Sequence, residues 1–197
     1  RKEMEYSASD KRLYLRLGDR VTHLPAGFKV VAVSKGAPFA AIVNFGVFLP
    51  TGVAFALATG FIWRRWPGPR RPSAAALMLL GVSVSYVGAA FFACDPGCPA
   101  EGSSRQMLHN GLGVIGYLSA PPALALLAAS ALAHGRRVLG ALTIAATALF
   151  VAGFLAMAAD DNGLLLGAWQ RLADYTLFAW TFLAGFMLGR ADRRAVQ

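Results

Sequence analysis

The 197-residue chain is 56% hydrophobic, and only 15% of its residues are charged, well below the roughly 25% typical of a soluble domain. Its mean hydropathy of +0.51 excludes an ordinary soluble globular protein and favours a membrane protein. A formal net charge of +9 would suggest a nucleic-acid partner in a soluble chain. Here most arginines flank apolar runs and the aromatic residues lie within them, so we expect the lipid bilayer, and no nucleic acid, as partner.

The first 36 residues differ from the rest, because charged residues of both signs are mixed with few apolar ones. We expect residues 1–36 to form a polar N-terminal tail, solvated or lying on the membrane surface, with a short amphipathic stretch through Leu13, Leu17 and Val21. Because the chain begins with Arg1 rather than methionine, we expect a fragment or a processed form.

Five apolar runs follow within residues 37–189. The first, Phe39 to Trp63, has about 25 residues without a charge and reaches about 37 Å as a helix, more than the roughly 30 Å of a hydrocarbon core. Pro50 with Gly52 predicts a kink in it. The sequence therefore predicts an all-α, multi-pass transmembrane helix bundle with five spans in this chain. The remaining spans are expected at about 74–94, 107–133, 138–159 and 168–188.

Arginine placement predicts the orientation of these spans. The loops after the first and third runs and the basic tail 190–197 hold every arginine beyond residue 36 except Arg105 and Arg171. The positive-inside rule places those loops and the C-terminus in the cytoplasm, as in a multi-pass protein of the cell (inner) membrane. The cysteine hairpin and the turn at 160–163 then lie outside. This topology also sends the N-terminal tail outside, and one further upstream helix would bring the total to six spans in the intact protein.

Three segments of the chain are distinctive: GAPFAAIVNFGVFLPTG at 36–52, FFACDPGCP at 91–99 followed by His109, and LGAWQRL at 166–172. Together they resemble a known family of prokaryotic membrane proteins, the domain of unknown function 998. The resemblance covers about residues 36–189 and implies six membrane helices, but it implies little about activity. Before Gly36 the chain reads KVVAVSK where the family has a Ser-Glu-Leu-type segment, so we expect the N-terminal part to be truncated or atypical.

The chain's two cysteines flank a turn-forming triplet, Asp-Pro-Gly, that can bring the Cα atoms of Cys94 and Cys98 within the roughly 4.4–6.8 Å that a disulfide requires. A structural disulfide, free structural thiols and a metal site remain as interpretations. The spacing is not CxxC and there is no second cysteine pair, so no metal ligand set and no cofactor is predicted.

Asp95 and His109 are the candidate catalytic residues. Asp95 closes the second span and His109 opens the third, so the hairpin can hold both near one plane, where an Asp can orient a His for acid–base chemistry. The alternative is that both residues cap helices and form ordinary hydrogen bonds. The pair is similar to that of the alkaline ceramidase-like membrane hydrolases, but no HxxxH motif accompanies it, and that activity is not assigned.

Four further polar residues inside the spans are candidate ligand-binding residues. Arg171 and Asp174 are three apart in the last span, which places them on one helix face and favours an internal ion pair. Asn44 and Tyr86 lie at similar depth in the first two spans and complete a predicted polar cluster. A Gly-x-Gly-x-x-Gly motif at 111–116 lies inside an apolar run without a βαβ unit, so it predicts close helix packing rather than a dinucleotide site.

These features lead to two hypotheses about function. The first is an integral membrane protein of undefined biochemical role, whose outer polar cluster is structural or binds a small hydrophobic ligand or lipid. The second is a membrane-embedded, lipid-acting hydrolase that uses Asp95 and His109.

Overall fold

The computed structural model of the chain describes residues 2–7, 12–17, 20–23, 40–67, 72–95, 98, 101–160 and 165–195. The chain divides into two compact units, Arg1–Val31 and Ala32–Gln197.

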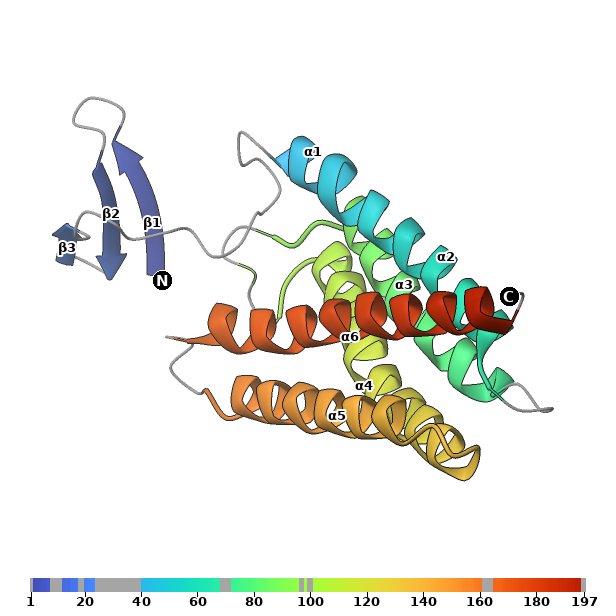
Figure 1. Cartoon of the computed structure of the whole chain (residues 1–197). Coiled ribbons are helices and arrows are strands. Elements are labelled where there is room, and N and C mark those ends of the chain that lie inside the picture. The colour runs from blue at the N-terminus through green and yellow to red at the C-terminus, as the bar shows by residue number, and fades with distance from the viewer. Residues whose placement is uncertain are drawn as a thin grey trace. The chain divides into compact units, whose positions relative to one another are not determined.

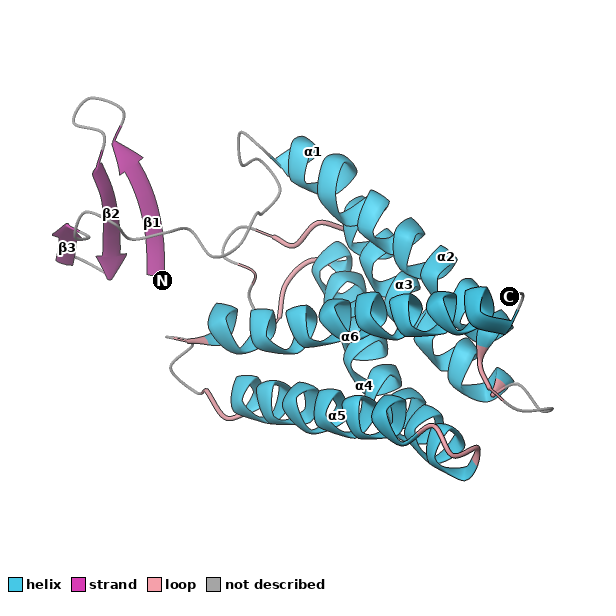
Figure 2. Cartoon of the chain, in the orientation of Figure 1, coloured by secondary structure: helices cyan, strands magenta, loops and turns pink. Residues whose placement is uncertain are grey.

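The N-terminal unit contains a three-stranded antiparallel sheet in the order β1-β2-β3 (Figure 2). Its strands are β1 (Lys2–Ser7), β2 (Arg12–Leu17) and β3 (Arg20–His23). The amphipathic stretch expected through Leu13, Leu17 and Val21 therefore lies in strands rather than in a helix. The reason is visible in the sequence: a spacing of four fits a helix, but it also fits the two-residue alternation of the RLYLRL segment.

The second unit is a bundle of helices (Figure 1), and five of them are long and apolar enough to cross a membrane. This confirms the all-α bundle with five spans that the sequence predicted. The first span, Ala40–Arg65, is continuous and consists of α1 (Ala40–Val43), the π-helical segment η1 (Asn44–Phe48) and α2 (Leu49–Arg65). The others are α3 (Ser73–Phe91), α4 (Ser104–Ala133), α5 (Arg137–Ala158) and α6 (Leu166–Ala195).

The π-helical turn lies where the sequence predicted a kink. Pro50 has no N–H to donate to the carbonyl of Gly46, so the α-helical hydrogen-bond ladder cannot be regular there. The wider turn of η1 ends at Phe48, two residues before this proline.

Helices that follow one another in the chain pack against each other, and α6 returns to contact α2. As a result α1, α4 and α6 all begin at the end that carries the α3–α4 connection, which we call the hairpin end. The glycine motif lies within α4, and its third glycine allows close packing: a Cβ at Gly116 would come within 2.8 Å of Ser85 on α3. Gly111 and Gly113 face open space, so only one glycine of the motif has the predicted packing role.

The bundle presents large apolar side chains to its surroundings. Leu57, Val138 and Phe182 are 72%, 71% and 71% exposed. Inside, Trp180 is buried and donates a hydrogen bond to Thr143 of α5 (2.9 Å), so its indole N–H is paired. A paired indole inside and large apolar side chains outside fit a bundle surrounded by hydrocarbon.

Candidate functional site

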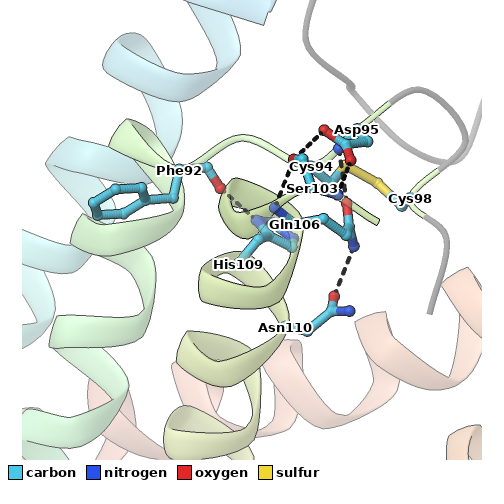
Figure 3. The surroundings of a disulfide bond; sticks show 8 residues. All are labelled: Phe92, Cys94, Asp95, Cys98, Ser103, Gln106, His109 and Asn110. Carbon is cyan, nitrogen blue, oxygen red and sulfur yellow. Dashed lines mark hydrogen bonds between the residues drawn. A yellow bond between two sulfur atoms is a disulfide. The ribbon is translucent and has the colours of Figure 1, made fainter. Parts of the chain in front are cut away.

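A disulfide joins Cys94 and Cys98 at the hairpin end, with Cα atoms 5.1 Å apart (Figure 3). The N–H of Cys98 donates to the carbonyl of Asp95 (2.8 Å), which closes a tight turn between the two cysteines. Cys98 has a φ of 45°, a left-handed conformation that its place in the turn requires. Of the three interpretations of the cysteines, the structure contains the disulfide.

Asp95 caps the following helix through Ser103. Its carboxylate accepts hydrogen bonds from the backbone N–H of Ser103 (2.8 Å) and from the Ser103 hydroxyl (2.9 Å). The Ser103 Oγ in turn accepts from the backbone N–H of Gln106 (3.3 Å) in the first turn of α4. Asp95 is therefore engaged in fixing the start of α4.

Gln106 connects this cap to the interior, and its side chain is fully buried. Its Oε1 accepts from the backbone N–H of Asp95 (2.7 Å), and its Nε2 donates to the Oδ1 of Asn110 (2.9 Å). Sequence reasoning missed Ser103 and Gln106, although their spacing, Ser-x-x-Gln, is that of a capping box. That spacing was the signal that could have found them.

His109 does not bind Asp95. Its Nδ1 lies 2.8 Å from the carbonyl oxygen of Phe92, at the last turn of α3, and Figure 3 shows the two side chains directed to different groups. The hairpin brings Asp95 and His109 to the same end of the bundle, as predicted, but each bonds elsewhere. The predicted acid–base pair is therefore not assembled. Each side chain has a different partner: Asp95 bonds Ser103 at the start of α4, and His109 bonds the carbonyl of Phe92 at the end of α3.

A second polar cluster lies deeper in the bundle, around Asp174. The Tyr117 hydroxyl of α4 donates to the Asp174 Oδ1 (3.0 Å), and the Tyr86 side chain of α3 is within hydrogen-bonding reach of the same carboxyl group. Gln170, one turn earlier on α6, is within reach of Tyr117. We call Tyr86, Tyr117 and Asp174 the Asp174 cluster. It joins three helices, and two of its members were predicted ligand-binding residues.

Arg171 is not part of this cluster. Its exposed side chain lines a groove between α5 and α6, and among the described side chains no ion pair joins it to Asp174. The expected internal pair was wrong because the helix face that carries Asp174 turns toward α3 and α4, where tyrosine hydroxyls replace the guanidinium.

Asn44 is buried in η1, 7% exposed, and its Oδ1 has no hydrogen-bond partner. It lies one turn before Phe48, whose ring contacts Tyr86 with centroids 6.1 Å apart. Asn44 is thus close to the Asp174 cluster along the bundle, on the side of the hairpin end, but no hydrogen bond joins it to Tyr86. Within the described residues, no group of three or more His, Cys, Asp or Glu side chains could hold a metal ion.

The family described as "Protein of unknown function (DUF998)" matches residues 32–187. The chain belongs to this family. With its five apolar helices, it is an integral membrane protein of the DUF998 family, whose biochemical role is unknown.

One further similarity is short. Over 33 residues this chain is 54% identical to a segment of the GMP synthase (glutamine-hydrolyzing) of Bartonella henselae. The match covers 17% of this chain and 6% of that enzyme. Because the chain spans so little of that enzyme's length, the similarity gives no indication of this protein's activity. No solved structure matches the chain.

Proposed function

We propose that this is a multi-pass protein of the cell membrane, with its C-terminus in the cytoplasm, that binds a small organic cation at the Asp174 cluster. One observation supports a cationic ligand. The carboxyl group of Asp174 lies inside a membrane-spanning helix, and no described lysine or arginine is paired with it. An ionisable side chain at membrane depth is costly unless it is paired, and such groups are usually functional.

The surroundings of Asp174 favour an organic cation over an inorganic one. Tyr117 stacks on Phe154 of α5, with ring centroids 5.5 Å apart, and Tyr86 contacts Phe178 of α6 at 5.6 Å. A carboxylate supplies a negative charge, and the faces of aromatic rings attract ammonium groups. Together they suit a primary amine or a quaternary ammonium ion with a small apolar substituent.

The distribution of polar side chains supports entry from the hairpin end. Asp174 lies about 12 Å along the axis from the first residue of α6. Asn110 precedes Tyr117 on α4 and Gln170 precedes Asp174 on α6, and both helices begin at this end. Asn44 lies near the start of the first span, at the same end. Asp174, Tyr86 and Tyr117 are themselves partly exposed. A polar ligand would therefore meet polar groups along its way to the carboxyl group.

The alternative, a hydrolase that uses Asp95 and His109, gains no support from the contacts of either residue. Both carboxylate oxygens of Asp95 accept hydrogen bonds from Ser103, and His109 bonds the carbonyl of Phe92. A reaction would require both side chains to leave these partners. We therefore assign Asp95 and His109 a structural role.

The cation hypothesis is tested by ligand-induced thermal stabilisation of the detergent-purified protein. Small amines and quaternary ammonium ions are compared with their uncharged isosteres. We expect at least one cation to raise the Tm where its isostere does not. Asp174→Asn keeps the shape of the side chain but removes its charge. It should weaken binding of that cation about tenfold to a hundredfold, which is the effect of losing one charge-assisted hydrogen bond.

Asp160→Asn is the matched control, because Asp160 lies at the same end and, among the described residues, its carboxylate accepts only from the backbone N–H of Leu165. This variant should bind the cation as the wild type does. If Asp174→Asn lowers the Tm of the free protein while no cation in the panel acts differently from its isostere, the cluster is structural and the proposal is wrong.

A further inference from the structure

A groove runs between α5 and α6 on the face of α6 that also carries Arg171. Its volume is about 450 Å³, within the roughly 300–1,000 Å³ of small-molecule sites. Its walls are almost entirely apolar, and they include Leu142 and Leu149 of α5 and Ala179 and Leu183 of α6. The groove is therefore suited to a hydrocarbon chain.

The length of the groove matches one leaflet of a bilayer. Arg171 and Leu183 are separated by about 18 Å along the axis of α6. Half of a roughly 30 Å hydrocarbon core is about 15 Å. A chain that begins at Arg171 and follows the groove would thus end near the middle of the membrane.

Arg171 gives the groove one charged end. It lies in the second turn of α6, close to the hairpin end, and among the described residues no carboxylate forms an ion pair with it. A guanidinium in this position presents a fork of N–H donors that matches a phosphate. Tyr175, one turn further on and 63% exposed, adds a hydroxyl at the same end of the groove.

We propose that the α5–α6 groove binds an anionic phospholipid from the leaflet at the hairpin end, with the lipid phosphate at Arg171 and one acyl chain along the groove. Charge complementarity selects this occupant: a second helix would fill the apolar walls but would leave the guanidinium unpaired in the membrane. The site is separate from the Asp174 cluster, which faces α3 and α4, so either proposal can fail without the other.

Native mass spectrometry of the detergent-purified protein tests the proposal with added phosphatidylglycerol, phosphatidylcholine and inorganic phosphate as probes. We expect retention of phosphatidylglycerol about tenfold above phosphatidylcholine, and no effect of phosphate on either. Arg171→Gln should remove this preference. Arg105→Gln is the matched control, since Arg105 is exposed in the first turn of α4, at the same end, and does not line the groove.

A second variant tests separately whether the acyl chain binds in the groove. Ala179→Phe fills the groove from α6 and should abolish retention of both lipids; if it does not fold, Ala145→Phe gives the same test from α5. The proposal is overturned if Arg171→Gln keeps the preference, if the filled groove still retains lipid, or if phosphate displaces the lipid. A dimer that excludes lipid would overturn it in favour of a second copy of the chain.

Discussion

Ser103 is the residue on which the order of the hairpin depends. Its hydroxyl donates to Asp95 and accepts from the backbone of Gln106, so it closes the connection between the disulfide loop and α4. The Gln106 side chain makes a second link between the same two segments, because its Oε1 accepts a hydrogen bond from the backbone N–H of Asp95. Two polar links thus hold the start of α4 against a five-residue covalent loop.

We expect the Ser103 cap to stabilise the bundle. Ser103→Ala should destabilise the bundle by about 1 kcal/mol, because the N–H of Gln106 and the Asp95 carboxylate each lose a partner. The measurement is the Tm of the detergent-purified protein, with Ser104→Ala as control, since Ser104 is exposed and follows the cap directly. Equal Tm values for the two variants would show that the cap contributes nothing.

The partners of single residues were only partly predictable from the sequence. The spacing of Ser103 and Gln106 predicts a cap, since both residues belong to one helix turn. The partner of Asp174 could not be found in this way, because Tyr117 is 57 residues away and meets it only after α4 and α6 are placed. Spacing within α6 favoured Arg171 instead, and it carries no information about which face of α6 turns toward α4.

At the level of elements, the contact between α2 and α3 depends on one glycine. A Cβ at Gly52 would lie 2.9 Å from both the carbonyl oxygen of Ser83 and the backbone nitrogen of Val87. The Ser83 hydroxyl also donates to the carbonyl of Gly52, so the two backbones are held at close range. The Val87 Cγ2 atom would lie nearer still, at 2.7 Å, but because the other two obstacles are backbone atoms, side-chain rotation alone cannot make room.

Two alanine substitutions in the same helix should have opposite effects. Gly52→Ala is expected to destabilise the bundle by about 1–3 kcal/mol through overpacking. Gly60→Ala faces open space and should be neutral or stabilising by up to about 1 kcal/mol, from helix propensity alone. Thermal unfolding of both variants in one detergent decides the matter, and a stable Gly52→Ala protein would contradict the close α2–α3 contact.

The helices themselves were predictable and the strands were not. A charge-free run as long as the one within Ala40–Arg65 has few alternatives in a bilayer, so composition alone predicts it. The segment Arg12–Leu17 is short, and its leucines fit both a helix and a strand. Pairing with β1 and β3 makes this segment a strand. The spacing of apolar residues within one segment does not predict which other segments pair with it.

For the whole molecule, charge differs between the two ends of the bundle. Arg64, Arg65, Arg136 and Arg137 lie at the end opposite the hairpin. At the hairpin end, Arg105 and Arg171 are accompanied by the acidic residues Asp95, Glu101 and Asp160. An excess of arginine at one end is the pattern of a cytoplasmic face, and it is the reason for the proposed orientation.

The two cysteines allow this orientation to be tested in intact cells. After treatment with an impermeant reductant, an impermeant maleimide should label the hairpin, because the chain contains no other cysteine. In a variant with both cysteines replaced by serine, Arg136→Cys should be labelled only after permeabilisation. Labelling of Arg136→Cys in intact cells, with an unlabelled hairpin, would reverse the proposed topology.

The π-helical turn at Asn44–Phe48 has a consequence for how this family can vary in length. A π turn is equivalent to one residue inserted into an α-helix, and it rotates the preceding residues by about 100° relative to α2. Deleting one residue of η1 would remove the extra residue of the π turn and swing Asn44 away from its buried position. Relatives that lack this residue would therefore present a different side chain to the bundle interior, although every helix keeps its place.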